Sequence, residues 1–465
     1  MKKRIKCLAL CALFLMSLIC PQKVFAEAFW PEGIEIESPN AIVMEESTGT
    51  ILYQKNIDEQ CYPASITKIM TAIIALENGD LSDTVVFSKD AVYKTEGSGI
   101  ARDVGEEMTL EQCMYAMLLE SANECAYAIA EHVGGTYEHF VEMMNEKAEE
   151  LGCTNTHFNN PHGLPDEDHY LSAYDMALIA REAWQNETFR IMTGTVRYQI
   201  PPTNKHSEIT YLQNHNIMIN NYKGSDHLYE PCVGGKTGFT QAAGNTLVTY
   251  AQKNGMTLIT VILHSSAPHH WDDTEALFEY CFANFGLMNI AENETRFSAF
   301  SGSVGELNDS TPYVELSTSD DVVLPLTAEF SDTEPRVVED ATEETAGRIE
   351  YSYANRIVGS ADILSLHPTI EPYVFHTVQE QQILTSDGNG DAEAGEARVI
   401  SITPGKVLII LGIVAAALLV LFIIIKFSSR FYVLRQKFYR WKNSKSPYHS
   451  IRRKGFSMRK HHRRK

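Results

Sequence analysis

Positive charge is scarce through most of this 465-residue chain. Residues 27–406 contain 19 Lys and Arg against all 60 Asp and Glu, which gives this part a net charge of −41. Nucleic-acid binding depends on Lys and Arg side chains that neutralise phosphates, so we expect no nucleic-acid partner. An acidic surface of this kind is typical of an exported, soluble body.

Cysteine is also sparse, and its spacing lacks any metal or redox pattern. Three of the nine cysteines lie in the first 20 residues, and the other six are Cys61, Cys113, Cys125, Cys153, Cys232 and Cys281. No spacing resembles Cys-x-x-Cys or a zinc-ligand pattern, and we expect neither a metal nor a cofactor. Six cysteines in an exported protein permit disulfides of undetermined pairing, but free buried thiols are an equal alternative.

The first 26 residues have the pattern of a secretory signal. A basic start at residues 2–6 precedes an apolar run over residues 7–20, and Ala26 stands before the first acidic residue. This pattern predicts a signal peptide over residues 1–26 that is cleaved after Ala26. An uncleaved membrane helix is the alternative, although the apolar run is short for a span.

A second apolar run lies near the C-terminus. Residues 407–425 are 19 uninterrupted apolar or small residues, and at about 1.5 Å per residue a helix of this length crosses a bilayer core. Residues 426–465 contain 15 Lys or Arg and no acidic residue, which favours the cytoplasmic side and contact with anionic lipid. We therefore predict a single-pass protein of the cell membrane, with an extracytoplasmic body, a transmembrane helix over 407–425 and a basic cytoplasmic tail over 426–465.

The body is long enough for two domains, which we place at residues 27–290 and 291–380. In the first domain we expect strands over 41–44, 51–53, 233–238, 245–252 and 256–264, and helices over 65–78, 109–119, 123–133, 136–151, 172–185 and 271–285. Strands at both ends with helices between them predict an α+β fold in which helices cover an antiparallel sheet. Short alternating stretches in 291–380 predict a small β-rich domain, and residues 381–406 a polar linker.

Ser65 and Lys68 form the first of three motifs with chemical potential. A serine hydroxyl is a poor nucleophile at neutral pH and needs a base. The spacing of three residues puts both side chains on one helix face, within hydrogen-bond reach. Lys68 can act as that base if burial and a cation such as Lys236 lower its pKa. A helix that begins near Ser65 also favours a developing oxyanion, but the pattern alone is common by chance.

The other two motifs lie further along the chain. Ser121-Ala122-Asn123 stands between two predicted helices, where a hydroxyl can relay a proton and an amide can orient Lys68; a helix break with ordinary capping is the alternative. Lys236-Thr237-Gly238 lies on a predicted strand whose cation and hydroxyl suit a substrate carboxylate, and an extended peptide could pair with the strand edge. In this order, the three motifs indicate a serine acyl-transfer enzyme.

The motifs resemble those of the low-molecular-mass penicillin-binding proteins, the serine-type D-alanyl-D-alanine carboxypeptidases. The segments that carry the resemblance are 63–72, 121–123, 160–164, 172–177 and 235–240. It implies a β-lactamase/transpeptidase-like fold followed by the β-rich second domain of that family. It also implies removal of the terminal D-alanine from peptidoglycan stem pentapeptides through an acyl-enzyme, with β-lactams as inhibitors.

The resemblance assigns a role to each motif residue. The implied catalytic residues are Ser65 as the acylated nucleophile, Lys68 as the base, Ser121 as the proton relay and Asn123 as the orienting amide. The implied substrate-binding residues are Lys236 and Thr237 for the carboxylate, Gly238 beside them, and Phe239, whose N–H would form the oxyanion hole with that of Ser65.

Two of four further positions depart from the family pattern. Glu124 stands where many relatives have Asp, and His215 where some carry an arginine that assists the carboxylate, while His162 and Asp175 match the family and are expected to be structural.

A DD-endopeptidase that cuts cross-links with the same residues stays open, as does a catalytically weak penicillin-binding sensor. A β-lactamase is disfavoured because the chain lacks a Glu-x-x-Leu-Asn deacylation motif between the second and third motifs.

Overall fold

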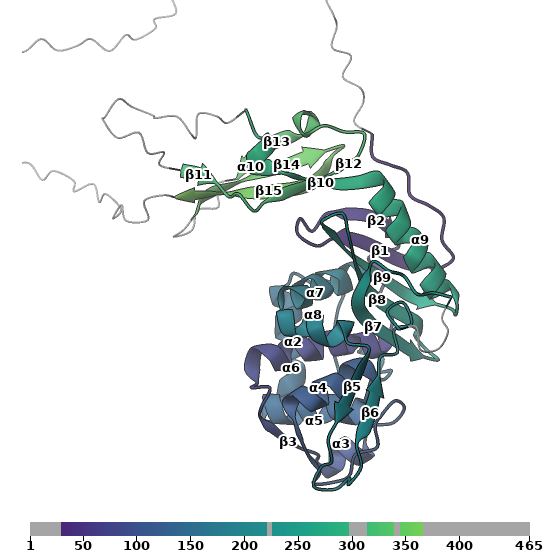
Figure 1. Ribbon diagram of the computed structural model, residues 1–465. Helices are drawn as coiled ribbons and strands as arrows, with labels where there is room; N and C mark the ends of the chain where they lie inside the picture. Colours follow the sequence, from purple (N-terminus) through teal and green to yellow (C-terminus); the bar gives the residue numbers. More distant parts are fainter. Residues whose placement is uncertain (1–28, 221–225, 297–313, 339–344, 366–465) are drawn as a thin grey trace, which may run out of the picture. The chain divides into compact units, whose positions relative to one another are not determined.

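The computed structural model describes residues 29–220, 226–296, 314–338 and 345–365 (Figure 1). The predicted signal peptide, polar linker, transmembrane helix and basic tail lie outside these ranges. Within the described ranges, no helix is both long enough and apolar enough to cross a membrane.

Five antiparallel strands form the main sheet, in the order β2-β1-β9-β8-β7. They are β1 (Asn40–Glu45), β2 (Ile51–Lys55), β7 (Cys232–Thr240), β8 (Gly244–Lys253) and β9 (Met256–Ser265). The two ends of the first region meet because β1 pairs with β9, with Ala41 opposite Ile262. Asn254 and Gly255 form the β8–β9 turn at positive φ angles of 56° and 80°, which Asn and Gly tolerate best. Strand β7 lies at the edge of this sheet.

Helices cover both faces of the main sheet (Figure 1). The helices of one layer are α2 (Lys68–Asn78), α4 (Leu110–Leu119), α5 (Asn123–Gly134), α6 (Tyr137–Glu150), α7 (Ala173–Gln185) and α8 (Glu187–Gly194), and α9 (His269–Asn284) lies on the other face. Alternate residues of β1 serve the two layers, because Ile42 belongs to the core under the large layer and Val43 to the core under α9. A strand buried on both faces reads as a continuous apolar run, and the predicted antiparallel sheet covered by helices is confirmed.

Several short elements differ from the predictions. The helix expected over 65–78 is a 3-10 turn, η1 (Ala64–Thr67), followed by α2, and Ala64, the first residue of the turn, has a φ of +52°. The elements that we did not predict are β3 (Thr84–Val86), α3 (Lys89–Tyr93), β4 (Glu107–Thr109), α8, β5 (Arg197–Ile200) and β6 (Thr210–Gln213). They are too short for hydrophobic periodicity to stand out.

A second antiparallel sheet follows α9. Its strands are β10 (Phe285–Asn289), β12 (Asp321–Pro325), β15 (Arg356–Ser365), β14 (Thr345–Tyr353) and β13 (Glu334–Val338) in spatial order, with β11 (Val314–Leu316) beside β15; α10 (Ile290–Asn293) and η4 (Phe330–Asp332) connect them. Val322, Ile349 and Tyr351 are buried in its core. Strand β10 already pairs with β12 before the boundary expected at residue 290. The described residues also fall into one compact unit, so the division into two domains stays a prediction.

All six cysteines of the body are free thiols. Burial raises the pKa of the thiols of Cys61, to about 11, and of Cys153 and Cys232, each to about 12. These thiols behave as small apolar side chains, which agrees with the alternative of free cysteines.

Candidate active site

Three segments that are far apart in sequence meet beside the edge strand β7. Lys68 Nζ lies 3.0 Å from Ser65 Oγ and 2.7 Å from Asn123 Oδ1. Lys236 Nζ, on β7, lies 3.1 Å from Ser121 Oγ. The structure therefore joins Ser65, Lys68 and Asn123 in one hydrogen-bonded group and Ser121 with Lys236 in a second. The charge of Lys236 is close enough to Lys68 to lower the pKa of its amine.

The turn that carries Ser65 is held against β7 and β8. Gly238 makes this close approach possible, because a Cβ atom at this position would lie 2.8 Å from Ser65 N and would also overlap Thr246 Oγ1. Thr246 Oγ1 donates a hydrogen bond of 2.7 Å to the carbonyl of Pro63, two residues before Ser65. Thr246 is a supporting residue that the motifs did not predict.

Lys68 is fully buried and its amine contacts three oxygen atoms. Besides Ser65 Oγ and Asn123 Oδ1, Nζ donates to the backbone carbonyl of His162 at 2.5 Å. Burial lowers the pKa of Lys68 well below its usual value, and the nearby positive charge of Lys236 lowers it further. The site therefore favours the neutral amine.

Lys236 is the second buried amine of the site. Its side chain is 1% exposed, and Nζ donates to Ser121 Oγ and to the carbonyl of Thr237, the latter at 2.8 Å. Burial lowers the pKa of Lys236 to about 7. Thr237 is half-buried and the side chain of Phe239 is exposed, so the edge of β7 is open to an incoming ligand.

The segment that carries Ser121 and leads into α5 at Asn123 is strained and well anchored. Ser121 has a φ of +61°, a conformation that side chains other than glycine rarely adopt. Asn123 N donates to the carbonyl of Ser98 at 2.9 Å, and Asn123 Nδ2 donates to the carbonyl of Glu96 at 2.5 Å. The second bond turns Oδ1 of the amide toward Lys68.

The four residues singled out for comparison have defined contacts. His215 Nε2 lies 3.0 Å from Glu120, and Glu124 accepts the N–H of Ile100 at 2.5 Å. His162 contributes its carbonyl to the lysine, while burial and then the charge of Lys68 lower the pKa of its ring to about 3.

Asp175, at the start of α7, is fully buried. Its carboxylate accepts the N–H of Asn155 at 2.6 Å and the hydroxyl of Thr156 at 2.8 Å. The two bonds tie the segment before residue 160 to α7 and agree with a structural role. The carbonyl of His162 was missed because every residue has a carbonyl, and no residue type marks this one.

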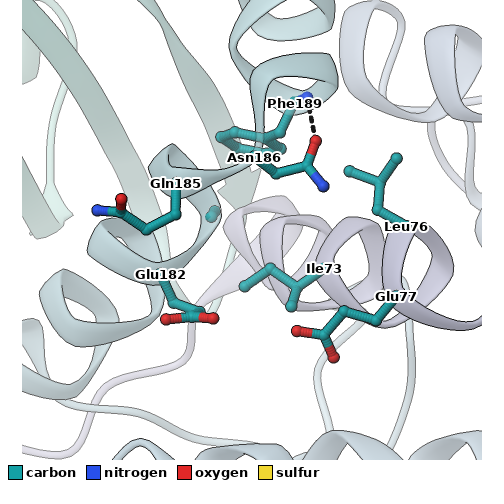
Figure 2. Close-up of a pocket in the computed structure, with 8 residues that line it drawn as sticks. Ile73, Leu76, Glu77, Glu182, Gln185, Asn186 and Phe189 are labelled. Atoms are coloured by element: carbon teal, nitrogen blue, oxygen red, sulfur yellow. Dashed lines mark hydrogen bonds between the residues drawn. The ribbon is translucent and has the colours of Figure 1, made fainter. Parts of the chain in front are cut away.

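One cavity away from this site lacks this chemistry. A cavity of about 220 Å³ lies between α2, α7 and α8, and the polar residues that line it are Glu77, Glu182, Gln185 and Asn186 (Figure 2). The amide of Asn186 in this view caps α8 by accepting the N–H of Phe189. Across the ranges that the structure describes, no group of His, Cys, Asp and Glu could hold a metal ion.

Comparison with known proteins places this site in a family. The family model described as D-alanyl-D-alanine carboxypeptidase matches residues 26–267, which include every site residue above and the whole main sheet. The chain belongs to this family. The second sheet lies entirely beyond the matched residues.

Curated D-alanyl-D-alanine carboxypeptidases show the same similarity. The chain is 34% identical to DacF of Bacillus subtilis (strain 168) over 293 residues, which cover 62% of this chain and 72% of that protein. It is 31% identical to the D-alanyl-D-alanine carboxypeptidase of Streptomyces sp. (strain K15), covering 53% of this chain and 88% of that one.

Solved structures agree with these sequence matches. A mutant of Streptomyces K15 DD-transpeptidase is 30% identical, with a TM-score of 0.50 over 54% of this chain and 100% of that one. A D-alanyl-D-alanine carboxypeptidase from Mycobacterium tuberculosis H37Rv is 28% identical, with a TM-score of 0.51 over 56% and 96%. The transpeptidase-like α+β fold predicted from the motifs is thereby confirmed.

Proposed function

We propose that this chain is a serine-type D-alanyl-D-alanine carboxypeptidase that removes the terminal D-alanine of peptidoglycan stem pentapeptides. Family membership and relatives of that name support the activity. The observation that carries the proposal is the arrangement of three oxygen atoms around the buried amine of Lys68.

A neutral amine has two N–H donors and one lone pair. The carbonyl oxygens of His162 and Asn123 can take the two donors of Lys68. The lone pair is then free to accept the O–H of Ser65, whose Oγ lies 3.0 Å from Nζ. A base in this state can take the serine proton as the hydroxyl attacks.

The acylation step follows from these positions. Ser65 Oγ attacks the carbonyl carbon of the penultimate D-alanine, and its proton passes to Lys68. The terminal D-alanine leaves as its nitrogen receives this proton from Lys68 by way of Ser121, and Lys68 is then neutral again. Ser121 Oγ also contacts the amine of Lys236. The N–H groups of Ser65 and Phe239 are proposed to stabilise the oxyanion, and Lys236 with Thr237 to bind the carboxylate of the leaving residue.

Hydrolysis of the resulting ester regenerates the enzyme. Water attacks the acyl carbonyl carbon and gives a proton to the base. The base returns this proton to Ser65 Oγ as the ester bond breaks, and the shortened peptide is released. Lys68 is the proposed base for this step as well, because it is the buried amine that already contacts Ser65 Oγ. The same site would form a stable adduct with β-lactams.

We also propose that the protein acts outside the cytoplasmic membrane, as a single-pass protein with a cytoplasmic tail. The signal pattern of residues 1–26 and the apolar run of 407–425 support this topology. Peptidoglycan is the substrate that an extracytoplasmic site would meet.

The experiment that tests the activity combines mass spectrometry with peptide turnover. The full chain is treated with penicillin, and release of D-alanine is measured from a pentapeptide and from a cross-linked dimer. We expect one adduct per chain on Ser65 and release from the pentapeptide, and Ser65→Ala should lose both while Ser331→Ala, at an exposed serine of η4, keeps both.

The outcomes separate the alternatives. Cleavage of the dimer without pentapeptide turnover would support the DD-endopeptidase. Labelling without turnover of either peptide would support the penicillin-binding sensor, and full activity of Ser65→Ala would overturn the mechanism.

A further inference from the structure

A loop over residues 96–102 holds Asn123 in its working orientation. The carbonyl of Glu96 accepts Asn123 Nδ2, and the carbonyl of Ser98 accepts Asn123 N. The N–H of Ile100 in turn donates to the carboxylate of Glu124, the next residue of α5. Three hydrogen bonds therefore connect this loop to the start of the helix that bears Asn123.

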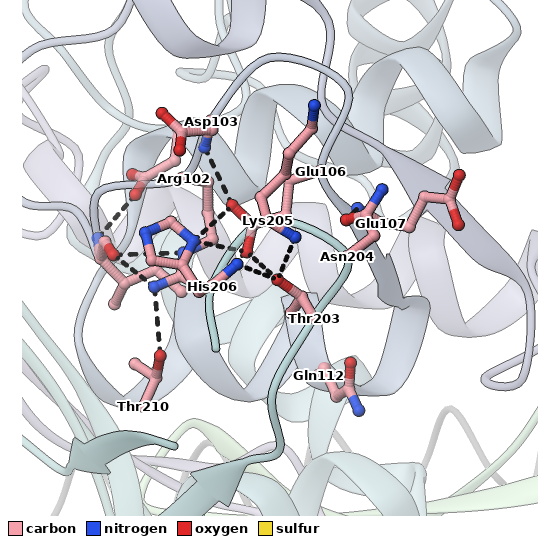
Figure 3. Close-up of polar contacts among 12 residues, drawn as sticks. Arg102, Asp103, Glu106, Glu107, Gln112, Thr203, Asn204, Lys205, His206 and Thr210 are labelled. Carbon is pink, nitrogen blue, oxygen red and sulfur yellow. Dashed lines mark hydrogen bonds and ion pairs between the residues drawn. The ribbon is translucent and has the colours of Figure 1, made fainter. Parts of the chain in front are cut away.

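A buried ion pair fixes the far end of the same loop. Arg102 donates twice to the carbonyl of Ile100, at 2.8 and 3.2 Å, and its Nη1 lies 2.8 Å from Glu106 Oε1 (Figure 3). The side chains of the pair are 3% and 0% exposed. A guanidinium that donates to a carbonyl and to a carboxylate at the same time fixes the path of the backbone between the two residues.

The β5–β6 hairpin completes the environment of this ion pair. Thr203 and His206, between the two strands, place their side chains 2.7 and 3.0 Å from Glu106, and Thr210 on β6 accepts from Arg102 at 3.1 Å (Figure 3). Burial acts to raise the pKa of Glu106, but hydrogen bonds from Asp103 N and Thr203 together with the charge of Arg102 outweigh it and lower the pKa. The carboxylate therefore stays ionised and keeps its donors.

The continuation of the same hairpin reaches the other side of the motif. Gln213 N donates to Glu120 at 2.6 Å, and the ring of His215 lies 3.0 Å from the same carboxylate. Glu120 directly precedes Ser121, whose positive φ is a conformation of the kind that costs about 1–3 kcal/mol and persists only where the surroundings enforce it. The hairpin thus contacts structure on both sides of the strained segment.

We propose that Arg102 and Glu106 are positioning residues of the reaction: their ion pair fixes the loop whose carbonyls hold Asn123, so that Asn123 Oδ1 stays aimed at the amine of Lys68. The inference rests on the proposed function, because it assigns Asn123 and Lys68 their catalytic roles. Without the ion pair, the loop and the Asn123 amide gain freedom, and the lone pair of Lys68 is aimed at Ser65 for less of the time.

The test measures the acylation rate with penicillin, and kcat and KM with pentapeptide, for Arg102→Met and Glu106→Gln in the full chain. We expect the acylation rate and kcat to fall roughly 10–100-fold, as a small misplacement of catalytic groups does. KM should change little, because Lys236 and Thr237 are untouched. Arg102→Lys, which keeps the charge and part of the hydrogen bonding, should recover part of the lost rate.

Lys147→Met is the matched control. Lys147 on α6 forms a half-buried ion pair with Glu77 at 2.8 Å, and neither residue takes part in the hydrogen bonds that hold the loop over residues 96–102. This variant should lower the melting temperature as Arg102→Met does, yet keep the acylation rate. If the folded Arg102→Met acylates at the wild-type rate, or if Lys147→Met loses as much activity for the same loss of stability, the positioning role is wrong.

Two further measurements keep the outcomes separate. If Arg102→Met does not fold, Thr210→Val removes a single bond to Arg102 and should still reduce the acylation rate by a few-fold; no reduction would overturn the inference. The wild type and Ser65→Ala are measured in parallel. Absence of a Ser65 adduct in the wild type would refute the proposed function, whereas a wild-type adduct with an equally fast Arg102→Met refutes the positioning role alone.

Discussion

The site beside the main sheet and a charged pair at the second sheet bury charge in different ways. Beside the main sheet, Lys68 and Lys236 are 0% and 1% exposed, and the hydrogen-bond partners of their amines are neutral oxygens. At the second sheet, the buried carboxylate of Glu294 lies 2.9 Å from Arg296 and accepts the hydroxyl of Tyr351 at 3.0 Å. The site buries two amines without a bonded counter-ion, whereas Glu294, like the Arg102–Glu106 pair of the first region, keeps a partner of opposite charge.

The difference separates function from stability. A buried charge without a partner is expensive, and the group responds by shifting its pKa toward the neutral form. Both active-site lysines show that shift, whereas at Glu294 the bonds from Arg296 outweigh burial and lower the pKa, so that the charge is kept. Strongly shifted pKa values without a paired charge are typical of catalytic sites.

The largest test of this contrast is Lys68→Met. The substitution removes the proposed base, and we expect the acylation rate to fall by about 10³-fold, within the range for general acid–base catalysis. The free energy of unfolding should change little, because relief from burying an amine opposes the loss of its bonds to Asn123 and His162. Stopped-flow acylation with chemical denaturation measures both, and a variant that loses stability but keeps its rate would break the contrast.

Lys236→Met tests the second buried amine through pH. We expect kcat/KM for pentapeptide to fall about 100-fold with the loss of a buried cation for the substrate carboxylate. The positive charge of Lys236 helps to lower the pKa of Lys68, so its removal raises that pKa and moves the acid limb of the acylation profile to higher pH. Lys253→Met, on the neighbouring strand with a surface bond to Glu279, should leave the profile in place. An unmoved acid limb in Lys236→Met would contradict the coupling.

Gly238→Ala compares a crowded glycine with a tolerant one. The new methyl group would press on Ser65 N and Thr246 Oγ1, and overpacking of this kind typically costs about 1–3 kcal/mol. We therefore expect a drop of roughly 10-fold in acylation rate. Gly286→Ala in β10 meets only the flexible end of Leu326 at 3.0 Å and should have no effect on the rate. Equal rates for the two variants would argue against close contact between β7 and the Ser65 turn.

Arg296→Met should have the smallest effect on activity. It leaves Glu294 without its cation and removes the contact of the guanidinium with the Phe330 ring at 5.2 Å. We expect a loss of about 1–2 kcal/mol in the free energy of unfolding, since Arg296 is partly exposed, and an unchanged acylation rate. Calorimetry and penicillin labelling of the same sample check this, and a slower acylation would show that the second sheet contributes to the site.

Local patterns were predicted best. The long helices and the strands of the main sheet agree with the sequence because each has enough residues to show its period. The predicted contact between Ser65 and Lys68 is confirmed, even though Ser65 lies in a 3-10 turn and not in an α-helix. Residues three apart face the same side in both helix types, so the spacing determines the contact whichever form the backbone takes.

Long-range partners escaped prediction for the opposite reason. The carbonyl of His162 and the hydroxyl of Thr246 support the site, but neither group belongs to a recognisable pattern. Arg102 and Glu106 are four residues apart without a helix between them, and their further partners come from β5–β6, about 100 residues later. Loop paths of this kind depend on contacts that no local period reveals.

Residue types and their order were sufficient to predict acyl transfer, the α+β sheet and the contact between Ser65 and Lys68, because these depend on chemistry and spacing within short segments. The protonation state of Lys68 and the orientation of Asn123 required packing between distant segments. Burial, the charge of Lys236 and the carbonyls of Glu96, Ser98 and His162 act over a few ångströms in space while lying tens of residues apart in the chain. A serine and a lysine three residues apart can act as a nucleophile and its base only where that packing excludes water and lowers the pKa of the lysine, so that its amine is neutral.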